Sequence, residues 1–173
     1  MRLDTEAWRR FFDSFERDAF RLETLSSYGV ASEDDELQGF LETGRLDIPD
    51  DDSWLSRVRH FRATGRRISR VHVLRQPLSD YLRYEFAVYG HTVRAGEDVR
   101  IVDDADGADP GLPDQDFWLF DDARVVRMDY DVHGRQVGRE FLDGINAAPY
   151  VAWKQRALER AVPFLEYRAT LAG

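Results

Sequence analysis

Three short runs of β-forming residues lie close together late in the chain, between Phe117 and Phe141. Two pairs of turn-forming residues, Asp121-Asp122 and His133-Gly134, separate them. Connections this short join antiparallel neighbours, because parallel strands need a crossover of about a dozen or more residues. The pattern therefore predicts an antiparallel meander, with strands over 117–120, 125–130 and 137–141.

Apolar residues in the rest of the chain recur mostly at helical spacing, as Trp8, Phe11, Phe12 and Phe15 do near the start. Pro77 should lie in the first turn of a helix that ends at Gly96, and Pro163 should bend or break the last helix. Further helices are expected near 37–43, 53–64 and from 149 onward, and short strands near 20–24, 68–74 and 99–102. Together these elements predict a single α+β domain, with helices flanking the late meander.

The composition agrees with one folded domain. The chain has 173 residues, of which 43% are hydrophobic, and this apolar share is ample for a core. There are no cysteines, which excludes a disulfide scaffold, a thiolate metal site and a cysteine nucleophile. No apolar stretch approaches the roughly 20 residues that cross a bilayer, and the first residues do not resemble a signal peptide. We therefore expect a cytoplasmic protein without membrane association.

Charge is distributed unevenly along the chain. Ten arginines and four acidic residues lie between Leu55 and Arg100, whereas ten aspartates and two arginines lie between Ile101 and Asp131. The formal net charge of −9 argues against direct nucleic-acid binding, and the basic segment has no helix-turn-helix pattern. Whether the basic and acidic segments face each other, and what the oligomeric state is, stay open at this stage.

The familiar cofactor and metal motifs are absent from the sequence. It contains neither a glycine-rich phosphate loop nor a G-x-S-x-G elbow, and no two histidines have the helical spacing of a metal site. Asp104-Ala105-Asp106-Gly107 resembles the middle of a calcium-binding loop, but Val102 and Pro113 occupy its first and last ligand positions. We expect no cofactor, no catalytic residue set and no metal, and a solvated loop is favoured over a looser cation site at Asp103, Asp104, Asp106 and Asp109.

The segment from Arg75 to Glu85 combines arginine, tyrosine and acidic residues on an expected helix. In the simpler reading, Asp80 and Arg83 form an exposed ion pair, worth well under about 1 kcal/mol. In the functional reading, guanidinium and phenol groups recognise an anionic group. The corresponding candidate binding residues are Arg75, Tyr81, Arg83, Tyr84, Glu85, Glu97, Asp98 and Trp118.

Trp118 belongs to a strand whose four side chains are all large and apolar. Alternation cannot bury all four on one face of a sheet. Either both faces are covered, which we favour, or one pair of these side chains forms an exposed binding surface.

Several runs of residues carry a resemblance to a known family. These are Pro77 to Glu85, Ala95 to Arg100, Asp116 to Asp122 and, near the start, Ala19 to Thr24. The combination resembles a family of uncharacterised actinobacterial proteins known only as a domain of unknown function, many of them encoded beside helix-turn-helix regulators. The resemblance extends over roughly Phe11 to Pro163, and it implies a regulatory neighbourhood without an activity.

Two functional hypotheses follow. The first is a non-enzymatic regulatory binding module that contacts a helix-turn-helix transcription regulator, or a small anionic signal. The second is a metal-dependent phosphoesterase, nuclease or toxin-like enzyme. It would use the basic run from Arg66 to Arg70 for phosphates and Asp116 for metal binding or base catalysis.

Overall fold

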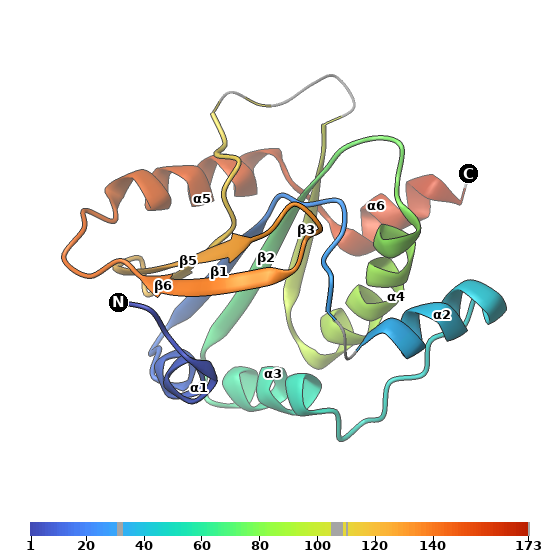
Figure 1. The fold of residues 1–173 in the computed structure, drawn as a ribbon, viewed down its shortest axis with the longest axis horizontal. Helices are drawn as coiled ribbons and strands as arrows, with labels where there is room; N and C mark the ends of the chain where they lie inside the picture. Colours follow the sequence, from blue (N-terminus) through green and yellow to red (C-terminus); the bar gives the residue numbers. More distant parts are fainter. Residues whose placement is uncertain (31–32, 105–108, 110, 173) are drawn as a thin grey trace.

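A seven-stranded mixed sheet runs through the middle of the molecule (Figure 1). The computed structural model describes residues 1–30, 33–104, 109 and 111–172. Over these residues the chain is a single α+β domain, as the sequence predicted. The strands, in the spatial order β6-β5-β4-β1-β2-β3-β7, are β6 (Gln136–Phe141), β5 (Arg124–Tyr130), β4 (Phe117–Phe120), β1 (Asp18–Glu23), β2 (Arg67–Leu74), β3 (Asp98–Asp103) and β7 (Val162–Pro163).

The sheet has a parallel half and an antiparallel half. Strands β1, β2 and β3 are parallel, with Arg21 beside Arg70 in register. Strands β4, β5 and β6 form the predicted antiparallel meander, and β4 pairs antiparallel with β1. Strand direction therefore changes between β1 and β4, which places the end of β1 beside the start of β4.

Helices cover both faces of the sheet (Figure 1). Helices α1, α3 and α4 pack on one face with α6 beside α4, and α5 packs alone on the other face. The helices are α1 (Thr5–Asp13), α2 (Asp34–Thr43), α3 (Ser53–Ala63), α4 (Asp80–Ala95), α5 (Ala148–Arg160) and α6 (Phe164–Leu171).

The four apolar side chains of β4 are all buried, because both faces of the strand are covered. Trp118 and Phe120 contact Phe12 of α1, with ring centroids 4.8 and 5.2 Å away. Phe117 points to the opposite face, where its ring lies 5.0 Å from that of Tyr150 in α5. The preferred sequence interpretation, coverage on both faces, is confirmed.

Two prolines bear on helix boundaries. The expectation that Pro77 lies in the first turn of a helix is wrong, because α4 begins only at Asp80. The hydroxyl of Ser79 accepts a hydrogen bond from the backbone N–H of Leu82 at 3.1 Å, and this cap sets the start of the helix after the proline. The expectation for Pro163 is confirmed: α5 ends at Arg160, and Val162–Pro163 pairs with β3 before α6 begins.

The turn between β5 and β6 holds the meander against the segment that follows β1. The backbone N–H of Gly29 donates to the carbonyl oxygen of Gly134 at 2.9 Å. Gly134 has a φ of +75°, and a Cβ placed there would lie 2.3 Å from the carbonyl oxygen of Ser27. Neither the left-handed backbone nor this close approach tolerates a side chain without cost.

We predict that Gly134→Ala destabilises the fold more than Gly144→Ala. Both glycines have positive φ, at +75° and +70°, so both substitutions carry a similar backbone cost of about 1 kcal/mol. A Cβ at Gly144 meets no atom within 4 Å, whereas a Cβ at Gly134 meets the Ser27 carbonyl. Urea unfolding of the two variants measures the difference. Equal losses in the two variants would show that the close approach does not matter.

Candidate functional site

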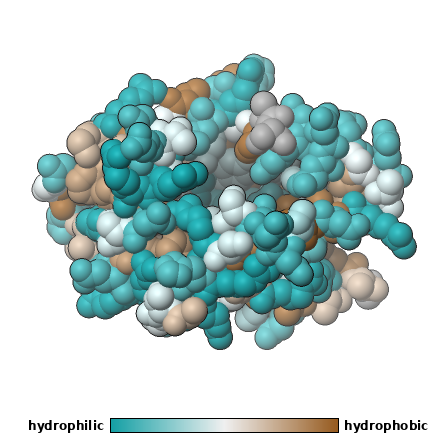
Figure 2. Space-filling view, turned by 90° about the horizontal axis from the view of Figure 1, so that it is seen from below, coloured by the Kyte–Doolittle hydropathy of each residue, from teal (hydrophilic) through white to brown (hydrophobic). Residues whose placement is uncertain are grey.

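A cavity of about 550 Å³ opens on the face of the sheet that α1, α3 and α4 cover. Its floor is formed by Arg21 and Glu23 of β1, Arg70 of β2 and Trp118 of β4. Figure 2, which views this side of the molecule, shows a hollow near the centre, surrounded mainly by hydrophilic residues. The volume is within the usual range for small-molecule sites, roughly 300–1,000 Å³.

Charged side chains reach the cavity floor because successive side chains of β1 and β2 point to opposite faces of the sheet. In β1, Phe20 and Leu22 face α5, whereas Arg21 and Glu23 face the cavity side, and all six residues of the strand are buried. Burying a charge without a partner is costly, so each of these groups needs counter-charges and hydrogen bonds from neighbouring elements.

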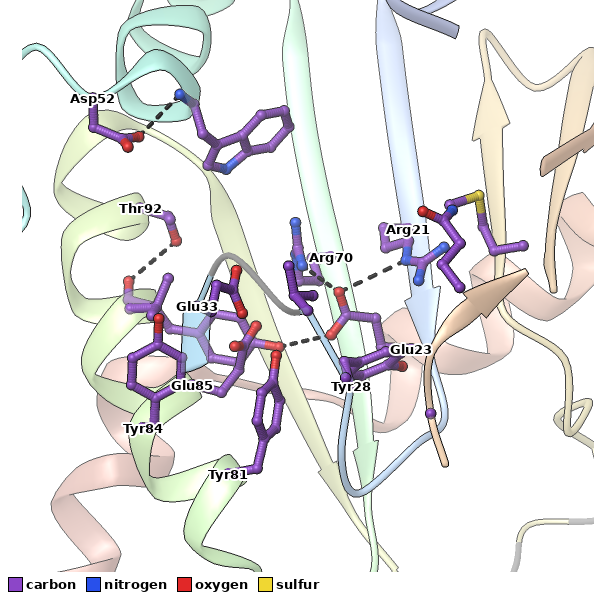
Figure 3. A pocket seen from close by; sticks show the side chains of 18 of the residues that line it. Arg21, Glu23, Tyr28, Glu33, Asp52, Arg70, Tyr81, Tyr84, Glu85 and Thr92 are labelled. Atoms are coloured by element: carbon purple, nitrogen blue, oxygen red, sulfur yellow. Dashed lines mark hydrogen bonds and ion pairs between the residues drawn. The ribbon is translucent and has the colours of Figure 1, made fainter. Parts of the chain in front are cut away.

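Glu23 is the most connected of these groups (Figure 3). Its carboxylate forms an ion pair with Arg70 and lies 3.7 Å from Nε of Arg21. It also accepts a hydrogen bond from the hydroxyl of Tyr89 at 2.9 Å and lies 3.3 Å from Nδ1 of His72. One carboxylate therefore ties β1 to β2 and to helix α4.

Asp116, just before β4, supports the same floor from the other side. Its carboxylate accepts hydrogen bonds from Arg21 Nη2 at 2.8 Å and from the Tyr28 hydroxyl at 2.6 Å. The backbone N–H and the hydroxyl of Thr24 also donate to it, at 2.9 and 2.7 Å. Asp116 is 3% exposed, so its oxygens are occupied in holding the segment after β1 against β4.

A third buried carboxylate, that of Glu97, completes the ion pairs of the floor. It accepts a hydrogen bond from Nε of Arg70 at 2.9 Å and another from Nε1 of Trp54 at 3.4 Å. Arg70 therefore lies between Glu23 and Glu97, and Arg21 lies between Glu23 and Asp116. The two guanidinium groups are thus paired with these three carboxylates.

Acidic and phenolic groups form one wall of the cavity. Tyr81, Tyr84 and Glu85 come from α4, Glu33 immediately precedes α2, and Glu36 lies in its first turn. The hydroxyl of Tyr84 donates to Glu36. No ion pair reaches Glu33, Glu36 or Glu85 from any residue that the structure describes, so this wall carries carboxyl groups without basic partners.

The environment separates the pKa values of Glu23 and Glu85. Burial favours the neutral form of Glu23, but the positive charge of Arg70, together with other neighbours, lowers its pKa to about 2. Burial and the negative charge of Glu23 raise the pKa of Glu85 to about 8, against the opposing effects of Arg70 and Tyr81; nearby Glu33 adds to the rise. At neutral pH Glu23 is therefore ionised and Glu85 is mostly protonated.

Aromatic and basic side chains form the opposite wall. Trp8 and Phe12 of α1 lie beside Trp54 of α3, and the guanidinium carbon of Arg139 lies 5.6 Å from the centre of the Trp8 ring. Among the described residues Arg139 makes no ion pair, and burial lowers its pKa. The cavity thus has an acidic wall, an aromatic wall with a guanidinium group, and a floor of paired charges.

The structure brings together about half of the residues that the sequence nominated. Tyr81, Tyr84, Glu85 and Trp118 line the cavity, and Glu97 lies buried behind Arg70. The three others lie outside the cavity in ion pairs: Arg75 with Asp114 at 2.8 Å, Arg83 with Asp80 at 3.1 Å, and Asp98 with Arg100 at 3.1 Å.

Sequence reasoning missed most of the cavity floor. Arg21 and Glu23 alternate with apolar residues along β1, and Arg70 lies among apolar residues of β2. This alternation is a signal in the sequence that the charged side chains share one face of the sheet. A charged residue at every second position normally marks a solvated face, and only the covering helices show that this one is enclosed. Tyr28 and Tyr130 carry no such signal, since Tyr28 lies in the segment that follows β1 and Tyr130 is the last residue of β5.

The acidic loop after β3 is held by basic and polar neighbours. Asp103 accepts a hydrogen bond from Tyr167 at 2.8 Å, and Asp109 forms ion pairs with Arg156 and Arg160 at 3.0 and 2.6 Å. Asp106, a member of the looser cation site considered from sequence, lies outside the described residues. Within the described part of the chain, no group of three or more acidic or histidine side chains is arranged to hold a metal ion.

Comparison with known proteins gives a family assignment. The sequence pattern of a domain family described as Domain of unknown function (DUF6879) matches residues 6–169. The chain belongs to this family. No curated protein matches the chain. The DUF6879 match spans the elements from α1 to α6, so the cavity lies within the family domain.

No helix in the described part of this DUF6879 domain is long and apolar enough to span a membrane.

The raised pKa of Glu85 predicts a pH-dependent stability. Its pKa is about 8 in the folded chain against 4.5 ordinarily, so the protonated carboxyl contributes stability that is complete below pH 4.5. That contribution is lost as the pH rises toward 8. The free energy of unfolding should therefore fall between pH 5 and 8 more steeply in the wild type than in Glu85→Gln.

Urea unfolding at a series of pH values measures both slopes. Both proteins contain the same histidines, so any histidine contribution to the slope is the same in both and drops out of the difference. The two slopes should differ by at most about 1.4 kcal/mol per pH unit. Parallel slopes would mean that Glu85 titrates normally.

Proposed function

We propose that the DUF6879 domain is a small-molecule-binding module with a regulatory role, and that its ligand occupies the cavity over β1 and β2. The observation that carries this proposal is the enclosure of paired charges and partly exposed aromatic rings around one space of about 550 Å³. Binding sites of this kind combine apolar walls with a few placed polar groups and carboxyls of perturbed pKa.

The position of the cavity adds support. Segments that follow the carboxyl ends of parallel strands commonly surround ligand sites in sheets of this type. Here the segment after β1 contributes Tyr28 and Gly29 to the cavity. The floor charges are already paired with one another, which suits a site that orients a ligand more than one that transforms it.

The metal-dependent hydrolase is the weaker proposal. Asp116, its expected metal or base residue, accepts hydrogen bonds from Arg21, Tyr28 and Thr24. In the expected basic run, Arg66 lies over the rings of Phe15 and Phe61, and Arg70 lies between Glu23 and Glu97. These arginines are engaged within the fold.

We expect small molecules that bind the cavity to raise the melting temperature of the wild type, and Val88→Trp to abolish that effect. Val88 lines the cavity, and a tryptophan there would fill part of the space without changing any charge. A thermal-shift screen of a metabolite library tests this. Val132→Trp is the matched control, since Val132 is 95% exposed.

Loss of the shifts in Val88→Trp alone would support the proposal, provided that circular dichroism shows a folded variant. Shifts of equal size in the wild type and in Val88→Trp would place the ligand elsewhere and contradict it. A screen without any shift would also count against it.

The partner of the module is proposed to be a helix-turn-helix transcription regulator, bound through the exposed surface around Arg83. Arg83 is largely exposed, and among the described residues its one ion pair is with Asp80 at 3.1 Å, so its removal should spare the fold. In a pull-down from native lysate, wild type should retain such a regulator and Arg83→Ala should lose most of it. Retention of the regulator by both proteins would show that this surface is not the interface.

A further inference from the structure

The two walls of the cavity carry polar groups of different kinds, with carboxyl groups on one wall and a guanidinium group on the other. Glu33 and Glu85 stand on one side of Glu23, and Arg21 stands on the other (Figure 3). Glu33 and Glu85 have no ion-pair partner among the described residues, whereas Arg139 is a guanidinium group without an acidic partner there. This separation sets the kind of ligand that the cavity can satisfy.

Two buried polar atoms reinforce the pattern. Nη1 of Arg21 has no hydrogen-bond partner among the described residues, although the side chain is only 5% exposed. Oε2 of Glu33 is buried and equally without a partner. A buried donor without an acceptor is energetically unfavourable, and so is a buried acceptor without a donor. A ligand that supplies an acceptor at one end and a donor at the other would satisfy both.

The aromatic rings indicate the body of the ligand. Trp8, Trp54 and Tyr130 line the cavity and are only partly buried, so each can offer some apolar ring surface to a planar group. Trp8 already has the guanidinium group of Arg139 over its ring, which places a cation next to the aromatic wall.

We propose that the ligand is a zwitterion of the amino-acid or dipeptide class with an aromatic side chain. Its protonated amine lies against the carboxylate of Glu33 and donates a hydrogen bond to the neutral carboxyl group of Glu85. Its carboxylate lies toward Arg21 and Arg139, and its ring packs between the tryptophans. This inference rests on the proposed function and specifies the ligand class of the same cavity.

The probe is the dipeptide L-alanyl-L-tryptophan, compared with its N-acetylated and its C-amidated forms. The free dipeptide should bind wild type, and each blocked form should bind at least tenfold more weakly, because each lacks one of the two charges. Isothermal titration calorimetry measures all three. L-Tryptophan serves as the smaller zwitterion.

Two variants assign the ends of the ligand. Glu33→Gln should weaken the free and amidated peptides and leave the N-acetylated form unchanged, whereas Arg139→Gln should weaken the free and N-acetylated peptides and leave the amidated form unchanged. Both positions are partly exposed, so both variants should fold. Asp80→Asn and Arg83→Gln remove an exposed acid and base outside the cavity, and neither should alter any affinity.

The inference is overturned if neither zwitterion binds, if a blocked form binds as tightly as the free peptide, or if Glu33→Gln and Arg139→Gln leave all affinities unchanged. These outcomes are separate from the failure of the proposed function. A neutral or singly charged ligand that loses binding in Val88→Trp would keep the cavity as a binding site and reject only the zwitterion.

Discussion

The rest of the site depends on the ion pairs and hydrogen bonds of the buried Glu23 carboxylate. It joins Arg21 of its own strand to Arg70 of the next, and through Tyr89 it reaches helix α4. Removing an ionised group from such a position leaves guanidinium groups buried without full compensation, which is costly. Because the charged groups of the floor are paired with one another, the wall groups that have no ion-pair partner among the described residues can interact with a ligand.

Local sequence patterns predicted the elements better than their arrangement. The meander was predictable because Asp121-Asp122 and Gly134 permit left-handed turns, and both aspartates have positive φ. The α+β class followed from the same patterns. The parallel pairing of β1, β2 and β3 was not predictable in this way, since it depends on crossovers through α3 and α4 and not on any short signal.

The candidate site was predictable only in part, and for a related reason. Tyr81, Tyr84 and Glu85 lie on one helix, so their spacing in the sequence predicts that they lie close together. Arg83 lies between them in sequence but points outward, where it pairs with Asp80. The partners of the floor residues are far away in sequence: Arg21 and Asp116 are 95 residues apart. No local pattern joins residues at that separation.

That separation has a consequence for how the chain acquires its site. During synthesis the amino-terminal part emerges first and contains Arg21, Glu23, Arg70 and α4, but not Asp116 or Tyr130. Contacts between segments so far apart form slowly, because closing a long loop costs entropy before the contact compensates for it. The cavity floor therefore reaches its final charge balance only after the meander docks on β1. In an intermediate without the meander, Arg21 would lack its acidic partner Asp116.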